Sequence, residues 1–348
     1  MDTDISESVI GFDALYASAD KCRKGVLWKD SAARYYLNSI EETLKLEREL
    51  KSGKYRAKPP IKFKVMHPKE RDITSIAFRD RVYQRSLNDN ILYPTMMRSF
   101  VADNAACQKG KGTDYARKRL IGFLREYWHK NGSDGYVLQI DIKGYYKSMQ
   151  HAVVYKQFDR RLDRWSYART VEVLSGQYAG DVGFDPGSQM VQIAGIAFLD
   201  ELDHYIKERL RIRYYIRYMD DLMLIHKDAE HLQYCRKGIG ERLADIGMQM
   251  HQKKTKIYPI SEGIIFLGFV FRLSRSGKVT MLLKPENVKA ERKKLRRLVG
   301  LAKKGKITKE KADECYRGWR AHAAKGDSAN LLVRMDQYYK SLWEEGET

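Results

Sequence analysis

The chain has 348 residues, with 65 Lys and Arg against 45 Asp and Glu, so its net charge is +20. This excess favours a polyanionic partner, with nucleic acid as the first candidate and an anionic membrane surface as the second. The longest stretch without a charged residue, 186–199, is too short for a transmembrane helix. The four cysteines lie far apart in the sequence and form no CxxC motif, which argues against a zinc ribbon or a disulfide scaffold. The first residues are acidic and carry no secretory signal, so we expect a cytoplasmic protein with no membrane segment.

The N-terminal third predicts helices and one pair of strands. Apolar residues recur at helical spacing over 31–56, and residues 79–99 are also typical of a helix. Residues 61–66 alternate apolar and basic, which predicts a strand with one solvent-facing side. Residues 71–78 form a second candidate strand that would pair with it.

The middle of the chain alternates between short apolar runs and helical segments. Residues 136–142 predict a buried strand, and 190–212 predict one long helix. Residues 214–226 consist of two apolar runs around a pair of acids, which indicates a hairpin. Residues 264–272 predict another strand, paired with 279–283 across a turn.

The composition changes after residue 283. Residues 284–325 hold 15 Lys or Arg and 5 Asp or Glu, a net charge of +10 and half of the total excess. The pattern is helical with basic faces, which predicts a separate helical subdomain. A solvated helical surface is the alternative, although such surfaces usually mix the two signs.

Three acids are the candidates for chemistry. Asp141 ends an apolar strand, and Asp220 and Asp221 stand side by side between two apolar runs. Carboxylates in such places are costly without a cation, and their mutual repulsion is relieved by a divalent metal. Oxygen ligands of this kind suit Mg²⁺. An ordinary polar turn is the alternative for the pair, but it leaves Asp141 and the basic composition unexplained.

These acids carry a resemblance to a known family. The run Tyr218-Met219-Asp220-Asp221 resembles the YxDD box of reverse transcriptases, and 141–146 resembles their upstream metal-binding motif. The resemblance implies an RNA-directed DNA polymerase with an α+β, right-hand fold. Its fingers would span 1–135 with part of 150–182, its palm 136–279 with the hairpin on an antiparallel sheet, and its basic helical thumb 280–348.

The same resemblance assigns roles at the reaction centre. Asp141, Asp220 and Asp221 would be the catalytic acids. Together with the backbone carbonyl of Ile142 they would hold two Mg²⁺ ions, with Mn²⁺ as an alternative. Two such ions support in-line nucleotidyl transfer. Tyr146 would exclude the ribose 2′-hydroxyl of ribonucleotides.

Further motifs extend the resemblance to the substrates. The residues it assigns to the incoming dNTP are Lys69, Arg71, Tyr146, Gln192 and Lys254. The residues it assigns to template and primer are Arg79, Lys109, Lys111, Phe266, Leu267, Gly268, Arg317 and Trp319. Some of these have a structural alternative, namely a salt-bridged surface for the fingers cations, a plain turn for 108–113, a solvated lysine for Lys254 and a core strand for 266–268.

Within the family, the chain most resembles the reverse transcriptases of diversity-generating retroelements, over about residues 12–339. It departs from them at Pro186, where a residue with no donor occupies the place set against the nascent base pair, so adenine-selective infidelity is not implied. The resemblance implies an RNA template, a DNA or RNA primer, dNTPs, a dedicated structured RNA and an accessory protein. A phage-defence reverse transcriptase that uses a non-coding RNA is one alternative. A non-catalytic RNA-binding scaffold and an RNA polymerase with the same chemistry are the others.

Overall fold

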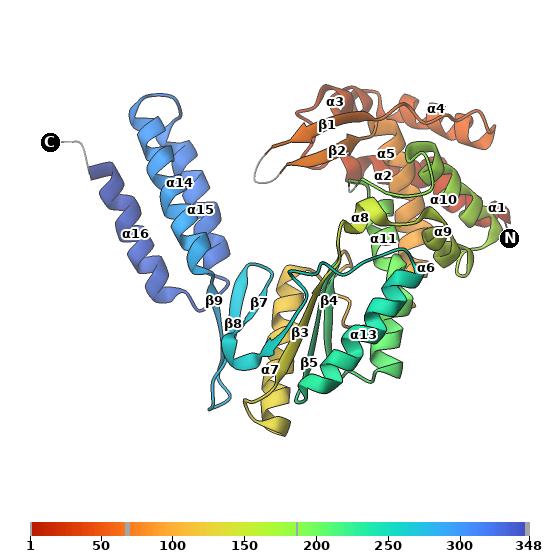
Figure 1. Ribbon diagram of the computed structural model, residues 1–348. Coiled ribbons are helices and arrows are strands. Elements are labelled where there is room, and N and C mark those ends of the chain that lie inside the picture. The colour runs from red at the N-terminus through yellow and green to blue at the C-terminus, as the bar shows by residue number, and fades with distance from the viewer. Residues whose placement is uncertain (1, 67–69, 186, 345–348) are drawn as a thin grey trace. The chain divides into compact units, whose positions relative to one another are not determined.

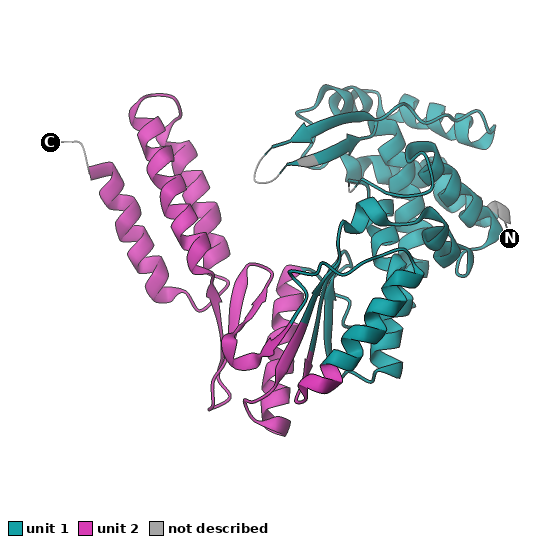
Figure 2. Cartoon of the chain, viewed as in Figure 1, with its two compact units in different colours: residues 1–112, 139–224, 233–256 teal, residues 113–138, 225–232, 257–348 magenta. Residues whose placement is uncertain are grey.

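The computed structural model describes residues 2–66, 70–185 and 187–344. The chain divides into two compact units, which Figure 2 distinguishes by colour. Unit 1 comprises 1–112, 139–224 and 233–256, and unit 2 comprises 113–138, 225–232 and 257–348. Among the described residues, no helix has both the length and the apolar character needed to span a membrane.

Unit 1 begins with a group of helices and a two-stranded sheet (Figure 1). Its first elements are α1 (Asp2–Ile10), α2 (Phe12–Arg23), α3 (Asp30–Leu37), α4 (Ser39–Lys51), β1 (Ile61–Val65), β2 (Arg71–Ser75), α5 (Phe78–Leu87), the π-helix η1 (Asn88–Leu92) and α6 (Tyr93–Met96). The predicted pairing of the two strands is correct, since β1 and β2 are antiparallel with Ile61 opposite Ser75. All five β1 residues are exposed, so the predicted buried side of this strand is wrong.

The predicted helix over 31–56 is broken at Asn38. There the backbone leaves the helical region (φ −113°, ψ 34°), and the Asn38 side chain donates to the Arg34 carbonyl at 3.3 Å. A short amide side chain that competes for a backbone carbonyl interrupts a helix in this way. The segment 79–99 is helical as predicted, but it consists of α5, η1 and α6 in succession.

The remaining elements of unit 1 include a four-stranded sheet with the strand order β4-β5-β3-β6. They are β3 (Tyr136–Asp141), α8 (Tyr145–Ser148), α9 (His151–Asp159), α10 (Arg164–Gln177), α11 (Gln189–Phe198), α12 (Asp200–His204), the π-helix η2 (Tyr205–Arg209), β4 (Tyr214–Tyr218), β5 (Asp221–His226), α13 (Ala229–Asp245) and β6 (Lys256–Pro259). The residues of β3, β5, α13 and β6 are divided between the two units. The sequence correctly predicted the β3 strand and the β4–β5 hairpin.

The predicted single helix over 190–212 is wrong. The chain leaves the helical region at Leu199 (φ −104°, ψ 11°) and restarts as α12, which continues into η2. In α12 the carboxylates of Asp200 and Asp203 are fully buried and pair with arginines. A break of one residue leaves the hydrophobic spacing almost unchanged, so periodicity does not reveal it.

Unit 2 contains a three-stranded sheet with the order β7-β8-β9. Its elements are α7 (Thr113–Asn131), the 3₁₀-helix η3 (Ile260–Glu262), β7 (Ile264–Phe266), β8 (Phe269–Leu273), β9 (Val279–Leu283), α14 (Pro285–Lys303), α15 (Lys309–Ala323) and α16 (Ala329–Glu344). The predicted pairing of the 264–272 segment with 279–283 is correct. The prediction of one continuous strand over 264–272 is wrong, because the chain turns at Leu267 and Gly268 and pairs β7 with β8.

The helices α14, α15 and α16 lie side by side (Figure 1) and share a small core. Leu295 and Met335 are fully buried in it, and the rings of Tyr316 and Tyr339 stack at 4.4 Å. The Tyr316 hydroxyl donates to Asp336 at 2.5 Å, and Arg320 pairs with the same carboxylate at 2.9 Å. The predicted basic helical subdomain is therefore a packed three-helix element.

The observed architecture confirms the predicted α+β class and the antiparallel hairpin that carries Asp220 and Asp221. The division into fingers, palm and thumb stays a prediction, because the two compact units do not correspond to those three parts.

The three-helix core gives a first prediction. Leu295→Ala removes fully buried methyl groups and leaves a cavity, so we expect it to destabilise α14–α16 by about 2–5 kcal/mol. Amide hydrogen exchange of the full chain measures this as faster local opening of the three helices. Val333→Ala, at a site that is 56% exposed, is the control and should change exchange little. Equal exchange in the two variants would contradict the described packing.

Candidate active site

Asp141 lies at the end of β3, where a bridge to the segment 249–251 fixes its backbone. The His251 N–H donates to the Asp141 carbonyl at 2.7 Å, and the Lys143 N–H donates to the Gln249 carbonyl at 2.9 Å. These two bonds flank the antiparallel pair of Ile142 and Met250. In such a pair the central residues direct their own N–H and C=O away from each other. The Ile142 carbonyl therefore points to the side away from Met250.

Asp220 lies on the two-residue turn between β4 and β5. Met219, the first turn residue, has a positive φ of 56°, whereas Asp220 does not. This combination matches a type II′ turn, whose first position is normally glycine. A methionine there is strained, so neighbouring groups must hold the turn. Asp221 follows as the first residue of β5 and is half-buried.

Asp141 and Asp220 interact electrostatically. Burial raises the pKa of Asp220, and the negative charge of Asp141 raises it further, while Lys254 and Arg217 act in the opposite direction. Lys254 Nζ lies 3.0 and 3.1 Å from the two Asp141 carboxylate oxygens. Two repelling carboxylates with a cation beside them form a site whose charge suits a divalent metal ion.

The donor set fits such an ion. Two carboxylates and a backbone carbonyl are hard oxygen ligands, and Mg²⁺ usually completes its shell with water and substrate phosphates. Among the described residues, no group of three or more His, Cys, Asp and Glu side chains is arranged so that it could hold a metal ion. A site that is open to substrate is consistent with both observations.

Tyr146 lies beside Asp220. Burial raises the pKa of its hydroxyl, with smaller contributions from Cys107 and Asp220. The Tyr146 ring packs against Gly195 of α11, where an added Cβ would lie 3.0 Å from the hydroxyl oxygen. Gly195 therefore permits the close approach of this ring to the helix.

An arginine under the turn was missed by the sequence analysis. Arg217 is fully buried in β4, and its guanidinium binds both oxygens of the fully buried Asp203, at 2.7 and 2.6 Å. Its Nη1 donates to the Met219 carbonyl at 3.1 Å. The signal was present, since an arginine inside the apolar run 214–218 needs a buried partner.

The fingers residues have mixed outcomes. Lys69 lies outside the described residues, and Arg71 begins β2 opposite Val65. Arg79 is committed within unit 1, where Nη2 lies 2.5 Å from Glu49 and the guanidinium lies 5.3 Å from the Tyr55 ring. This is the salt-bridged alternative that the sequence left open.

Asp185 is joined to the β1–β2 sheet by a hydrogen bond. Thr74 Oγ1 of β2 donates to Asp185 at 2.5 Å, a contact that the sequence did not indicate. Pro186 lies outside the described residues. Gln192 is exposed on α11, as a residue that contacts nucleotide must be.

The glycine-rich segment 108–112 forms a turn in which the two lysines differ. Lys111 Nζ donates to the carbonyls of Ala102 and Asn104, both at 3.0 Å, so it fixes the loop itself. Lys109 is exposed, and its Nζ lies 5.0 Å from the Tyr93 ring centroid. Lys109 is thus the better placed of the two for a phosphate contact.

The predicted primer residues lie in unit 2. Leu267 (φ 46°) and Gly268 (φ 88°) form the tight turn between β7 and β8, as in a type I′ hairpin. Phe266 is 2% exposed and belongs to the core. On α15, Arg317 is exposed and Trp319 packs partly against the three-helix core.

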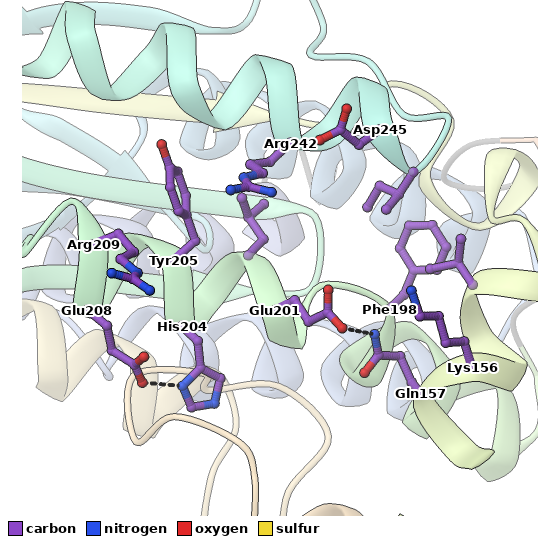
Figure 3. Close-up of a pocket in the computed structure, with 13 residues that line it drawn as sticks. Lys156, Gln157, Phe198, Glu201, His204, Tyr205, Glu208, Arg209, Arg242 and Asp245 are labelled. Atoms are coloured by element: carbon purple, nitrogen blue, oxygen red, sulfur yellow. Dashed lines mark hydrogen bonds and ion pairs between the residues drawn. The ribbon is translucent and has the colours of Figure 1, made fainter. Parts of the chain in front are cut away.

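A polar pocket of about 380 Å³ in unit 1 lies apart from these residues. It is bounded by α9, α12, η2 and α13 (Figure 3). Two interactions lie among its polar groups, with His204 Nδ1 2.6 Å from Glu208 and the Gln157 amide donating to Glu201 at 3.1 Å. None of the predicted site residues lines it.

Comparison with known families decides the broader question. The model of the family "Reverse transcriptase (RNA-dependent DNA polymerase)" matches residues 62–271, more than half of the chain. The chain belongs to the reverse transcriptase family. This match confirms the predicted family, whose members are RNA-directed DNA polymerases with a right-hand fold and generally use divalent metal ions.

Other comparisons add little. No curated protein sequence matches the chain. Among solved structures, it is similar to apo telomerase from Candida tropicalis truncated from its C-terminal domain, with 13% identity over 70% of this chain and 60% of that one and a TM-score of 0.49. It is also similar to Candida albicans telomerase in complex with a TWJ fragment of telomeric RNA, with 11% identity over 76% and 55% of the chains and a TM-score of 0.49. The chain thus spans less than two thirds of each telomerase chain.

The contact between Tyr146 and Gly195 gives a second prediction. Gly195→Ala forces the Tyr146 ring to move by a few tenths of an ångström. If this ring is the sugar gate, the shift should lower kcat/KM for dNTPs by roughly tenfold and change the ratio of dNTP to rNTP use. Single-nucleotide extension of a primer on RNA measures both quantities.

Gly176→Ala is the matched control for this variant, since Gly176 is also helical but has open space around its Cα. It should leave both quantities unchanged. Unaltered sugar preference in Gly195→Ala and in Tyr146→Ala would refute the gate.

Proposed function

We propose that this reverse transcriptase extends a DNA or RNA primer on an RNA template with dNTPs, using Mg²⁺, with Mn²⁺ as an alternative. The observation that carries the proposal is that Asp141 at the end of β3, paired with Lys254, acts electrostatically on Asp220 in the β4–β5 turn. Asp221 supports the pair from the start of β5. Two divalent ions bound there would supply charge stabilisation for the attacking and leaving oxygens.

The surrounding residues act on the nucleotide. Lys254 neutralises Asp141 in this structure, and its ammonium becomes free to meet phosphate oxygens when that carboxylate has another cation partner. A lysine beside the catalytic carboxylate is able to donate a proton to the departing pyrophosphate. Tyr146, against α11, limits the space at the sugar, and Gln192 contacts the nucleotide from the same helix. Lys69 and Arg71 bind the triphosphate.

Further side chains hold the nucleic acid. The Leu267–Gly268 turn and its flanking Phe266 position the primer, and the exposed Arg317 with Trp319 contacts the duplex. Lys109 contacts the template backbone, and Arg79 and Lys111 add positive charge to the template and primer site. Lysines and arginines on phosphates supply affinity without reading sequence.

In the cell, we infer a retroelement role of the mutagenic type, in the cytoplasm, with a dedicated structured RNA and an accessory protein. This rests on the resemblance of about residues 12–339 to the reverse transcriptases of diversity-generating retroelements. Phage defence with a non-coding RNA is the rival, and the departure at Pro186 favours it.

The central prediction concerns the acids. Replacement of both Asp220 and Asp221 by Ala should lower primer extension by roughly a thousandfold or more, because ion-mediated charge stabilisation is worth several kcal/mol. Binding of the primed RNA, measured by fluorescence anisotropy, should stay close to wild type, because phosphate contacts lie elsewhere. Extension that persists in this variant would refute the assignment.

The cellular role makes a separate prediction. Nucleic acid that co-purifies with the protein should include one dominant RNA and cDNA copied from it. Sequencing of both would support the retroelement role if the cDNA differs from its template at adenines. A faithful or repetitive cDNA would overturn that role and favour defence.

A further inference from the structure

The turn that carries Asp220 depends on a buried ion pair behind it. Arg217 and Asp203 are both fully buried, and two parallel hydrogen bonds of 2.7 and 2.6 Å join them. This is the forked geometry that arginine forms with a carboxylate and lysine cannot reproduce. The Tyr215 hydroxyl donates a third bond to Asp203, at 2.5 Å.

Two further N–H groups of the Arg217 guanidinium donate to other elements. Nη2 donates to the Ile196 carbonyl in α11 at 3.0 Å, and Nη1 donates to the Met219 carbonyl in the turn at 3.1 Å. One side chain thus connects α12, α11 and the catalytic turn. Because Met219 holds a backbone conformation that normally requires glycine, its carbonyl needs such an external partner.

The backbone of Arg217 joins the same turn to the segment 103–105, which precedes the glycine-rich turn at 108–112. Its N–H donates to the Asp103 carbonyl at 3.0 Å, and its carbonyl accepts from the Ala105 N–H at 2.9 Å. The Cys107 and Met219 sulfur atoms lie 3.9 Å apart. Arg217 therefore sits where the loop 103–111, α11 and the Asp220 turn meet.

We propose that Arg217 and Asp203 are positioning residues that set the direction of the Asp220 carboxylate and thereby the affinity of the site for divalent ions. The inference rests on the proposed function, since it takes Asp220 as a ligand. Groups that orient metal ligands from behind commonly change metal affinity or activity by 10- to 100-fold when replaced. The pair itself touches no substrate, and its contribution passes through the Met219 carbonyl.

The test separates positioning from folding. Arg217→Lys keeps the charge but loses the fork, so we expect kcat to fall and the Mg²⁺ concentration for half-maximal extension to rise, each by roughly 10-fold or more. KM for dNTP at saturating Mg²⁺ should change little. The second readout is direct binding of Mn²⁺ alone, followed by electron paramagnetic resonance of the free ion, which should weaken in parallel.

The chain offers a matched control in the neighbouring pair of Arg161 and Asp200. Asp200 is also fully buried in α12, and Arg161 Nη2 lies 2.6 Å from it, but no bond from this pair reaches the turn. Arg161→Lys should lower the melting temperature while leaving Mg²⁺ dependence and Mn²⁺ binding at wild-type values.

A double variant covers the case in which Arg217→Lys does not fold. Arg217→Met with Asp203→Leu removes both charges at similar volume, a change that buried ion pairs often tolerate. We expect a folded protein with the same weakened metal response. Wild-type Mg²⁺ dependence and Mn²⁺ binding in either folded variant would overturn the inference. A wild-type protein that fails to extend a primer would instead overturn the proposed function.

Discussion

Repulsion between the Asp141 and Asp220 carboxylates is the constraint around which unit 1 is arranged. Each acid is placed where the backbone leaves it little freedom, Asp141 by the bridge to 249–251 and Asp220 by a strained two-residue turn. Burial and, to a smaller extent, the charge of Asp141 raise the pKa of Asp220, and Lys254 pairs with Asp141. A pair of like charges held this way favours any dication over water alone, so the fold keeps its least stable electrostatic arrangement at the place where chemistry needs it.

A buried ion pair next to the turn holds this arrangement in place. A buried Arg–carboxylate pair contributes little net stability, but loss of one partner costs about 3–5 kcal/mol because an uncompensated charge remains. The pairing of Arg217 with Asp203 is thus better understood as a specification of one geometry than as a source of stability. The same guanidinium bonds the Met219 carbonyl, so the specified geometry includes the turn itself. The buried Arg217 and the half-buried Asp220 thus lie three residues apart on a single hairpin.

The sequence predicted those features that depend on local pattern. The β3 strand, the hairpin around Asp220 and the basic helical segment all follow from spacing and composition, and the structure has them. It did not predict features that depend on a distant partner. Glu49, the partner of Arg79, lies on a different helix, and Asp203, the partner of Arg217, lies on another element, so local spacing reveals neither pair. The turn at Leu267–Gly268 was missed for a different reason, since a two-residue reversal hardly disturbs an apolar run.

The positive charge of the chain obeys the same logic as its acids. On α14, exposed cations recur four residues apart at Lys289, Lys293 and Arg297, so they lie on one face of the helix. Like charges at this spacing repel and weaken a helix, by a few tenths of a kcal/mol for each pair. The helix tolerates them because Leu295 and Val299 bind its other face to a core. A row of phosphates along that face would remove the repulsion and release counterions, which gives binding a steep dependence on salt. The excess charge therefore has a direction: the stripe on α14 is destabilising for the free protein and favourable only in a complex with a polyanion.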